Sequence, residues 1–279
     1  DRPGFGVTRT AHELLVGLPE MIAADGTRIG TRGVGEAIAA RTGAGKVESL
    51  ARLPERIALR DIAASGGAPD SDPLDLPFAI GESALQPVVL QARQVPHLLV
   101  VGRQGCGKTT ALAALGQAIC TRLTPEQAQI TIIDPKTTLI GKIRGPAVRA
   151  YAYTPEDIDA VLAELAATLA DRLPPAGLTQ EELLARRSWQ GPHHFVLIDD
   201  EQELRPGGVV GKPAATAPLW NLIERGREIG LHVVAARLPG NWAAVSAMNP
   251  LLQKLTGSRT PTLFMDNDPQ TVKVYGRVS

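Results

Sequence analysis

The most constraining feature of this 279-residue sequence is a glycine-rich segment that follows an aliphatic run. Residues 97–110 read HLLVVGRQGCGKTT, so Gly102 is followed by four residues and then by Gly107-Lys108-Thr109. This is the phosphate-loop pattern, which requires a strand before it and a helix after it. Glycines let successive backbone N–H groups point at phosphate oxygens, and the helix N-terminus adds a favourable partial charge. The segment predicts a nucleotide site; the alternative is an ordinary glycine-rich turn between a strand and a helix.

The pattern also assigns roles within the loop. Lys108 is expected to bridge the β- and γ-phosphates and to act in catalysis, while the Thr109 hydroxyl is expected to bind Mg²⁺. Cys106 is open to two interpretations, a reactive thiol favoured by the helix N-terminus or merely a small side chain. The residues expected to surround the nucleotide are Gly102, Arg103, Gln104, Gly105, Cys106, Gly107, Lys108, Thr109 and Thr110.

A second aliphatic strand, 195–198, ends in the carboxylates Asp199, Asp200 and Glu201. In phosphate-loop proteins such a strand supplies an aspartate for Mg²⁺, and Asp199 is the predicted metal ligand. The next position commonly carries a glutamate that polarises the attacking water, whereas here it is the shorter Asp200. Because a misplacement of about 1 Å can cost about a hundredfold in rate, we expect nucleotide binding with slow hydrolysis. Taken alone, the segment is also compatible with an exposed acidic turn.

Strand and helix patterns alternate from residue 75 onward. This order predicts an α/β fold, with a mostly parallel sheet flanked by helices on both faces. Thr154 followed by Pro155 is a helix start, and Thr179 with Glu182 has the spacing of a capping box. The other expected helices cover 108–123 and 219–228, and the expected strands cover 86–90, 97–101, 129–134, 195–198, 231–236, 261–265 and 271–275.

The first 74 residues have a different character. Short strands are expected over 6–8 and 13–18, and a short helix over 33–41. Residues 65–73 are rich in turn formers and predict a linker or a long surface loop. Since so short a segment has a marginal core of its own, we expect residues 1–74 to pack on a core domain formed by residues 75–279.

Composition excludes several classes of protein. Twenty-nine basic and 29 acidic residues give a formal net charge of zero, which argues against coating nucleic acid or an anionic membrane by bulk charge. Two cysteines cannot build a disulfide framework, so a reducing cytosol is the expected compartment. No apolar run approaches the 18 residues or so of a membrane span.

His193 and His194 lack further ligands at zinc spacing, which favours surface or strand-edge histidines. The chain starts at Asp1 and its first methionine is Met21, so we expect a fragment of a longer protein.

Together these residues resemble the FtsK/SpoIIIE-type motor ATPases and, within them, the type VII secretion ATPases of the EccC group. The resemblance covers about residues 75–279 and implies a RecA-like P-loop NTPase fold. Residues 1–64 are similar, more weakly, to the strand pair and linker between tandem EccC domains. Besides the strand end at 195–201, the segments that carry the resemblance are PHLLVVGRQGCGKTT (96–110), IIDPKTTLIG (132–141) and RGREIGLHVVAARLP (225–239).

Two positions depart from the family pattern. Asp200 replaces the glutamate after the metal aspartate, and Arg237 replaces a glutamine that contacts the γ-phosphate, so a cation is expected there. Both departures resemble the degenerate second and third ATPase copies of EccC, and they imply a C-terminal copy with weak ATP hydrolysis. Arg227 matches an arginine of the family and is the candidate finger for a neighbouring domain's nucleotide, with Arg225 in reserve. The alternative is a solvated arginine paired with a nearby glutamate.

The resemblance implies an ATP-binding motor domain of a type VII (ESX) secretion complex, with ATP and Mg²⁺ as ligands. Expected partners are other ATPase domains of the same protein, other subunits of the complex, and secreted WXG100-type proteins recognised through a C-terminal export signal. Exposed residues within 242–248 are candidates for that contact. A hexamer is compatible with the full assembly. The expected location is the cytoplasmic face of the cell membrane, without insertion of this segment itself.

Two alternative functions stay open. An FtsK-like DNA translocase would favour basic loops around a pore, and the zero net charge makes nucleic acid an unexpected partner. A structural or regulatory nucleotide-binding domain would use the nucleotide only to make the fold or an interface rigid.

Overall fold

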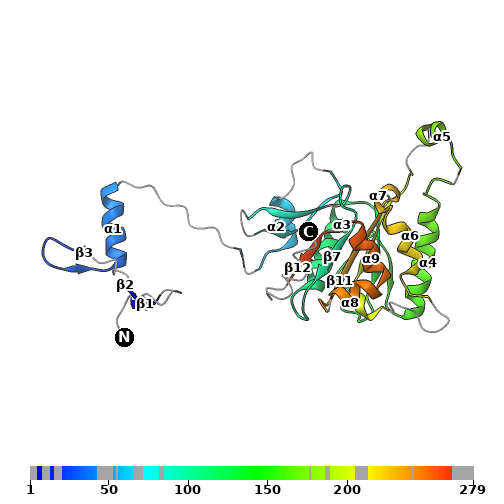
Figure 1. Cartoon of the computed structure of the whole chain (residues 1–279). Coiled ribbons are helices and arrows are strands. Elements are labelled where there is room, and N and C mark those ends of the chain that lie inside the picture. The colour runs from blue at the N-terminus through cyan, green and yellow to red at the C-terminus, as the bar shows by residue number, and fades with distance from the viewer. Residues whose placement is uncertain are drawn as a thin grey trace. The chain divides into compact units, whose positions relative to one another are not determined.

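The computed structural model describes residues 5–7, 13–15, 21–42, 53–54, 56–65, 72–81, 85–175, 177–185, 189–204, 213–240 and 242–265. The chain divides into two compact units, Asp1–Ala51 and Arg52–Ser279 (Figure 1). The packing of residues 1–74 on the core stays a prediction. The expected strand 271–275 lies outside the described residues.

The first unit contains two short hairpins and one helix. Antiparallel strands β1 (Phe5–Val7) and β2 (Glu13–Leu15) confirm the two expected strands. A second hairpin pairs β3 (Met21–Ile22) with β4 (Arg28–Ile29), and the sequence pattern did not predict it. Helix α1 (Thr31–Thr42) confirms the expected helix and extends beyond it at both ends.

The second unit is built on a parallel sheet, as predicted. Its six strands lie in the order β12-β7-β11-β10-β8-β9, and every neighbouring pair is parallel. The strands are β7 (Leu98–Val101), β8 (Ala128–Ile133), β9 (Val148–Ala152), β10 (His193–Ile198), β11 (Leu231–Arg237) and β12 (Thr262–Phe264). Because parallel strands share a direction, the loops that follow β7, β8 and β10 all lie at the carboxyl edge of the sheet.

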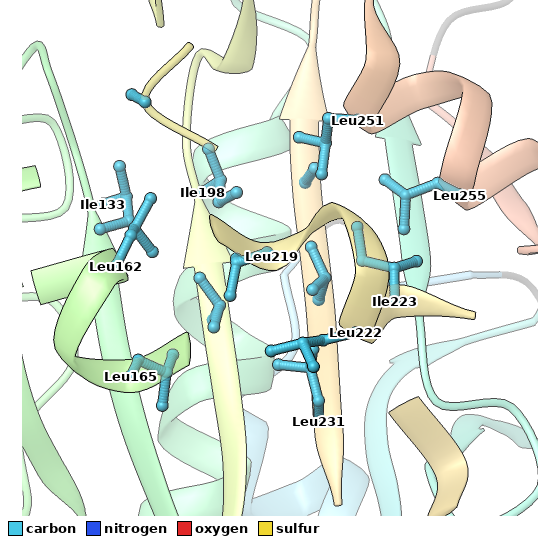
Figure 2. Close-up of a cluster of buried hydrophobic side chains, with 14 of the residues drawn as sticks. Ile133, Leu162, Leu165, Ile198, Leu219, Leu222, Ile223, Leu231, Leu251 and Leu255 are labelled. Atoms are coloured by element: carbon cyan, nitrogen blue, oxygen red, sulfur yellow. The ribbon is translucent and has the colours of Figure 1, made fainter. Parts of the chain in front are cut away.

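Helices cover one face of this sheet with aliphatic side chains, which Figure 2 shows in close-up. Leu162 and Leu165 come from α4 (Pro155–Ala170), and Leu251 and Leu255 from α9 (Pro250–Gly257). They pack on strand residues such as Ile198. The N-terminus of α4 has the predicted cap, because Thr154 Oγ1 accepts a hydrogen bond from Asp157 N at 3.2 Å.

The opposite face is covered by α3 (Lys108–Arg122) and by an antiparallel hairpin of β5 (Asp75–Ile80) and β6 (Pro87–Gln91). Short helix α2 (Leu59–Ser65) contacts β5 and α3. Since both faces are covered, β7 and β11 are buried along their whole length, which explains their continuous aliphatic sequence. The capping box at Thr179 is formed at the start of α5 (Gln180–Ala185), where Thr179 N donates to Glu182 Oε2.

The single helix expected over 219–228 is wrong. The chain forms α6 (Trp220–Ile223) and α7 (Gly226–Ile229), with a break between them. His97 explains the break. Its Nδ1 accepts a hydrogen bond from Val233 N at 3.0 Å, which leaves Nε2–H to donate to Ile223 O at 2.8 Å. That carbonyl is thereby satisfied by the imidazole instead of by the next turn of a helix. Gly226 allows the approach, since a Cβ there would lie 2.7 Å from the ring.

A short helix, α8 (Trp242–Met248), precedes α9. Asn249 caps α9, accepting a hydrogen bond from Leu252 N at 3.3 Å. Within the described ranges, no helix combines the length and the apolar character needed to cross a bilayer.

Candidate nucleotide site

The carboxyl edge of the sheet holds a cavity of about 350 Å³ beside the N-terminus of α3. Residues far apart in the sequence meet there because β7, β8 and β10 end at this edge. Lining residues are Gln104, Gly105, Gly107, Lys108, Thr109, Thr110, Lys136, Thr138, Asp200 and Leu238. Most of the predicted phosphate-loop residues therefore face one cavity.

The loop conformation requires glycine at the positions the pattern singled out. Gly107 precedes α3 with φ +102°, in the left-handed region, and a Cβ there would approach Met265 Cε to 3.3 Å. A Cβ on Gly102 would lie 2.4 Å from Cys106 Sγ. Lys108 is buried, and its Nζ donates to Arg103 O at 2.9 Å, so the ammonium lies within the loop. Cys106 thus packs against Gly102, which agrees with its interpretation as a small packing side chain.

Asp199 and Thr109 are in contact, as the metal prediction requires. Asp199 is buried, and its Oδ2 accepts hydrogen bonds from Thr109 Oγ1 and Thr138 Oγ1, both at 2.7 Å. A hydroxyl and a carboxylate are the hard oxygen ligands that Mg²⁺ prefers, with water and phosphate oxygens completing its shell. Among the described residues no cluster of three His, Cys, Asp or Glu side chains is placed to hold a metal. The donor set fits Mg²⁺ held jointly with phosphates.

Asp134 organises the loop after β8, although the sequence patterns assign it no role of its own. It is fully buried and accepts hydrogen bonds from Leu139 N and the Tyr151 hydroxyl at 2.6 Å and from Thr138 N at 3.0 Å. Burial, with Asp134 as acceptor, raises the pKa of Tyr151. These bonds place the Thr138 hydroxyl against Asp199. The sequence feature that could have indicated this role is an aspartate at the end of an aliphatic strand, with two threonines three and four residues later.

Asp200 lines the cavity in a left-handed conformation, with φ 48° and ψ 51°. Its Oδ1 accepts a hydrogen bond from Gln202 Nε2 at 2.9 Å, and its Oδ2 lies 3.4 Å from Lys136 Nζ. Lys136 also donates to Glu203 Oε1 at 2.8 Å, and this hydrogen bond is the main cause that raises the pKa of Lys136. Asp200 thus lies at the cavity, and the ammonium of Lys136 engages its carboxylate.

A family model described as FtsK/SpoIIIE matches residues 59–188, which include the phosphate loop, Asp134 and Lys136. A solved structure described as an ATPase is 33% identical, covers 78% of this chain and 84% of its own, and has a TM-score of 0.68. This chain contains a domain of the FtsK/SpoIIIE family.

Within this family the chain is similar to EccC proteins. The ESX-5 secretion system protein EccC5 of Mycobacterium marinum is 37% identical over 213 residues, which cover 72% of this chain and 15% of that protein. The structure of Thermomonospora curvata EccC (ATPases 2 and 3) in complex with a signal sequence peptide is 28% identical, covers 96% of this chain and 47% of its own, and has a TM-score of 0.69. The fold is that of a P-loop ATPase domain. The chain spans less than a fifth of its ESX-5 relatives.

Arg237, expected from the resemblance to replace a glutamine at the γ-phosphate, is not among the residues that line the cavity. Arg237 Nη1 lies 2.8 Å from Glu201 Oε2, and both side chains are less than 5% exposed. Asn249 Nδ2 donates to Glu201 Oε1 at 2.5 Å. Burial raises the pKa of Glu201, while Arg237 and Asn249 oppose that shift. This corrects the expectation that the Arg237 guanidinium lies at the γ-phosphate. Instead, Arg237 forms a buried ion pair with Glu201.

The predicted arginine finger lies away from this cavity. Arg227 is on α7, directly before β11, and so at the amino edge of the sheet, opposite to Lys108. Arg225 Nη2 pairs with Glu228 Oε2 at 2.6 Å, as the solvated-pair alternative proposed. Arg227 is exposed. Its action on the nucleotide of a neighbouring FtsK/SpoIIIE-type domain stays a prediction.

The histidines of β10 correct another expectation. His194 is only 2% exposed, since β10 is a central strand with both faces covered. His193 is half-buried, and its Nδ1 lies 2.9 Å from His232 Nε2. Burial is the main cause that lowers the pKa of His193 and His194 to about 4. His194 is a buried core residue, so the surface interpretation is wrong for it, whereas His193, half-buried at the first position of β10, fits the strand-edge interpretation.

Proposed function

We propose that this chain is the Mg-ATP-binding motor-type ATPase domain of a type VII secretion complex, with slow hydrolysis. One observation carries the proposal. The Thr109 hydroxyl, directly after Lys108, lies 2.7 Å from the buried carboxylate of Asp199 beside a cavity that the phosphate loop lines. Strand, loop and helix thereby provide phosphate donors and Mg²⁺ ligands together. Similarity to EccC supports the secretion context.

The chain's own residues suggest how the nucleotide is held. Residues at the start of α3 line the cavity, and their backbone N–H groups would donate hydrogen bonds to the phosphates, because a helix N-terminus favours anions. Lys108 would leave Arg103 O for a phosphate oxygen, and Thr109 with Asp199 would hold Mg²⁺, which supplies charge neutralisation when bound. Asp200 is shorter than the usual glutamate and is paired with Lys136. This pairing supports slow hydrolysis and keeps a mainly regulatory nucleotide role as the second candidate.

Replacing Lys108 tests the nucleotide site. We expect Lys108→Ala to weaken Mg-ATP binding by about 10- to 100-fold, the effect of losing one hydrogen bond between charged groups. Calorimetric titration measures the affinity. Melting with Mg-ATP gives a second readout, because a ligand that binds only the folded state stabilises it. Lys142→Ala is the matched control, since Lys142 is an exposed lysine outside this cavity. Equal binding by Lys108→Ala and the parent would refute the site.

We further propose that the domain acts at the cytoplasmic face of the membrane with other ATPase domains and complex subunits. Recognition of secreted WXG100-type proteins through a C-terminal export signal is supported by the EccC structure with a signal sequence peptide. The chain offers an apolar groove of about 760 Å³ between α2, β5, α3 and β12. Ile57 is an exposed apolar residue on its wall. In the segment expected from the sequence, 242–248, Met248 is an exposed apolar residue, with a fractional exposure of 77%.

Two substitutions decide between these surfaces. We expect Ile57→Asp to weaken binding of a fluorescent export-signal peptide at least fivefold, because a charge would replace an apolar contact in the groove. Met248→Asp, on the α8 surface, should bind the peptide like the parent. Fluorescence anisotropy measures both. If Met248→Asp weakens binding and Ile57→Asp does not, the contact lies on α8 instead.

A further inference from the structure

We propose that Lys136 is a second phosphate-binding cation, which distinguishes a nucleoside triphosphate from a diphosphate and leaves Asp200 when the terminal phosphate is bound. The inference rests on the nucleotide site proposed above. Lys136 follows β8 by three residues, and its side chain faces the same cavity as Lys108 and Asp200. The cavity therefore has cations from two different strand ends.

Lys136 is held by acidic side chains at the rim of the cavity. Its Nζ lies 2.8 Å from Glu203 Oε1 and 3.4 Å from Asp200 Oδ2. The Lys136 and Glu203 side chains are 45% and 43% exposed, whereas that of Asp200 is 18% exposed. The ammonium thus sits between water on one side and the cavity on the other. Asp200 is the partner on the cavity side.

These ion pairs are weak enough to exchange. Exposed pairs between lysine and carboxylate contribute about 0–1 kcal/mol, because water competes and side-chain entropy is lost. A terminal phosphate carries more charge than a carboxylate and would stand inside the cavity, where charges are screened less. A lysine ammonium on its flexible four-carbon stem binds phosphate as a point charge without a fixed geometry. Moving from the carboxylates to the phosphate is therefore favourable for Lys136.

The exchange has a consequence for Asp200. Once Lys136 leaves, the hydrogen bond from the Gln202 amide to Oδ1 remains, and Oδ2 is free to accept a proton or to orient water. Asp200 becomes available only after a triphosphate is in place. With a diphosphate, Lys136 stays on Asp200 and Glu203. The pair thus makes the state of Asp200 depend on the third phosphate.

Comparing two nucleotides separates this role from a structural one. The probes are Mg-ADP and a non-hydrolysable Mg-ATP analogue, titrated calorimetrically into the full chain. We expect Lys136→Gln to bind the triphosphate about tenfold more weakly, the effect of one hydrogen bond between charged groups. Its diphosphate affinity should change less than twofold. Lys136→Arg should keep most of the discrimination, and Lys142→Gln, an exposed lysine outside the cavity, should behave as the parent.

The Glu203→Gln variant tests the same proposal with the opposite expected change in triphosphate affinity. Glu203 holds Lys136 away from the phosphates, so its loss should strengthen triphosphate binding by about two- to threefold, within the small energies of exposed pairs. Melting without nucleotide should be unchanged in both variants, because these side chains lie at the surface. This arm tests the proposal even if Lys136→Gln folds poorly.

Several outcomes would overturn the proposal. If Lys136→Gln leaves the triphosphate-to-diphosphate affinity ratio unchanged, or weakens both nucleotides equally, Lys136 does not sense the third phosphate, while nucleotide binding itself stands. Tighter triphosphate binding by Lys136→Gln would mean that the lysine only restrains Asp200. If the parent binds neither nucleotide, both this proposal and the proposed function fail.

Discussion

Three consecutive acidic residues after β10 have different neighbours, and these neighbours determine what each residue can do. Asp199 accepts two threonine hydroxyls, which suits a site for Mg²⁺. Asp200 faces the cavity and is engaged by Lys136. Glu201 turns inward to Arg237 and Asn249. Because a 3₁₀ turn starts at Glu201, successive side chains leave the strand end in different directions. Residues of one chemical type thus acquire separate roles.

The Glu201–Arg237 pair permits a prediction about stability. Arg237→Gln should destabilise the fold by about 3–5 kcal/mol, because it leaves a buried carboxylate without its cation. The double variant Arg237→Gln/Glu201→Gln should recover most of that loss, since both charges are then gone. Urea unfolding of the parent, both single variants and the double variant gives the interaction energy. A double variant whose loss of stability equals the sum of the two single losses would show that the pair is not coupled.

At the scale of elements, His97 joins β7, β11 and α6. Its two ring nitrogens bond to Val233 N and Ile223 O, so only the neutral imidazole with Nε2–H satisfies both partners. Burial lowers the pKa of His97 to about 4. Neighbouring His232 is fully buried, and burial lowers its pKa too. The amino edge of the sheet therefore depends on uncharged imidazoles.

Acid should destabilise this edge. In the unfolded chain His97 takes up a proton near its ordinary pKa of about 6.5, whereas in the fold it does so only near 4. Between these values the unfolded state binds more protons, so stability falls as pH decreases from about 6.5 to 4, by up to roughly 3 kcal/mol for this residue. His97→Gln keeps an amide donor and an acceptor but does not titrate. Its melting temperature should therefore fall less than that of the parent over this range; a parallel fall would exclude His97 as a source.

The phosphate loop and Asp199 were predictable because their chemistry follows strand ends, where residue type and position are fixed by local pattern. Lys136 and Thr138 were not assigned to the site, since only the pairing of β8 with β10 brings their loop to Asp199. The break between α6 and α7 depends on His97, more than 120 residues away in sequence. Strand β9 escaped prediction because Arg149 and Tyr151 interrupt its apolar pattern.

For the molecule as a whole, the common direction of the parallel strands separates two groups of functional residues. The phosphate loop, Asp199 and Lys136 follow the carboxyl ends of strands, while Arg225, Arg227 and the buried histidines lie toward the amino ends. The nucleotide site and the candidate finger are therefore separate regions of one domain.

Arg227 and Lys108 lie at opposite edges of the sheet, and this restricts how two such domains can contact each other. If the arginine of one domain serves the nucleotide of the next, the two must meet head to tail, with unlike surfaces in contact. A twofold pair joins identical patches, so a patch that contains only one of these regions would leave the other unused. Repeating a head-to-tail contact gives either a closed ring or an open helix, according to the rotation between neighbours. In a ring, the direction from the Arg227 edge to the Lys108 edge would be the same in every subunit. The direction of the strands would then fix the order in which subunits follow one another around the ring.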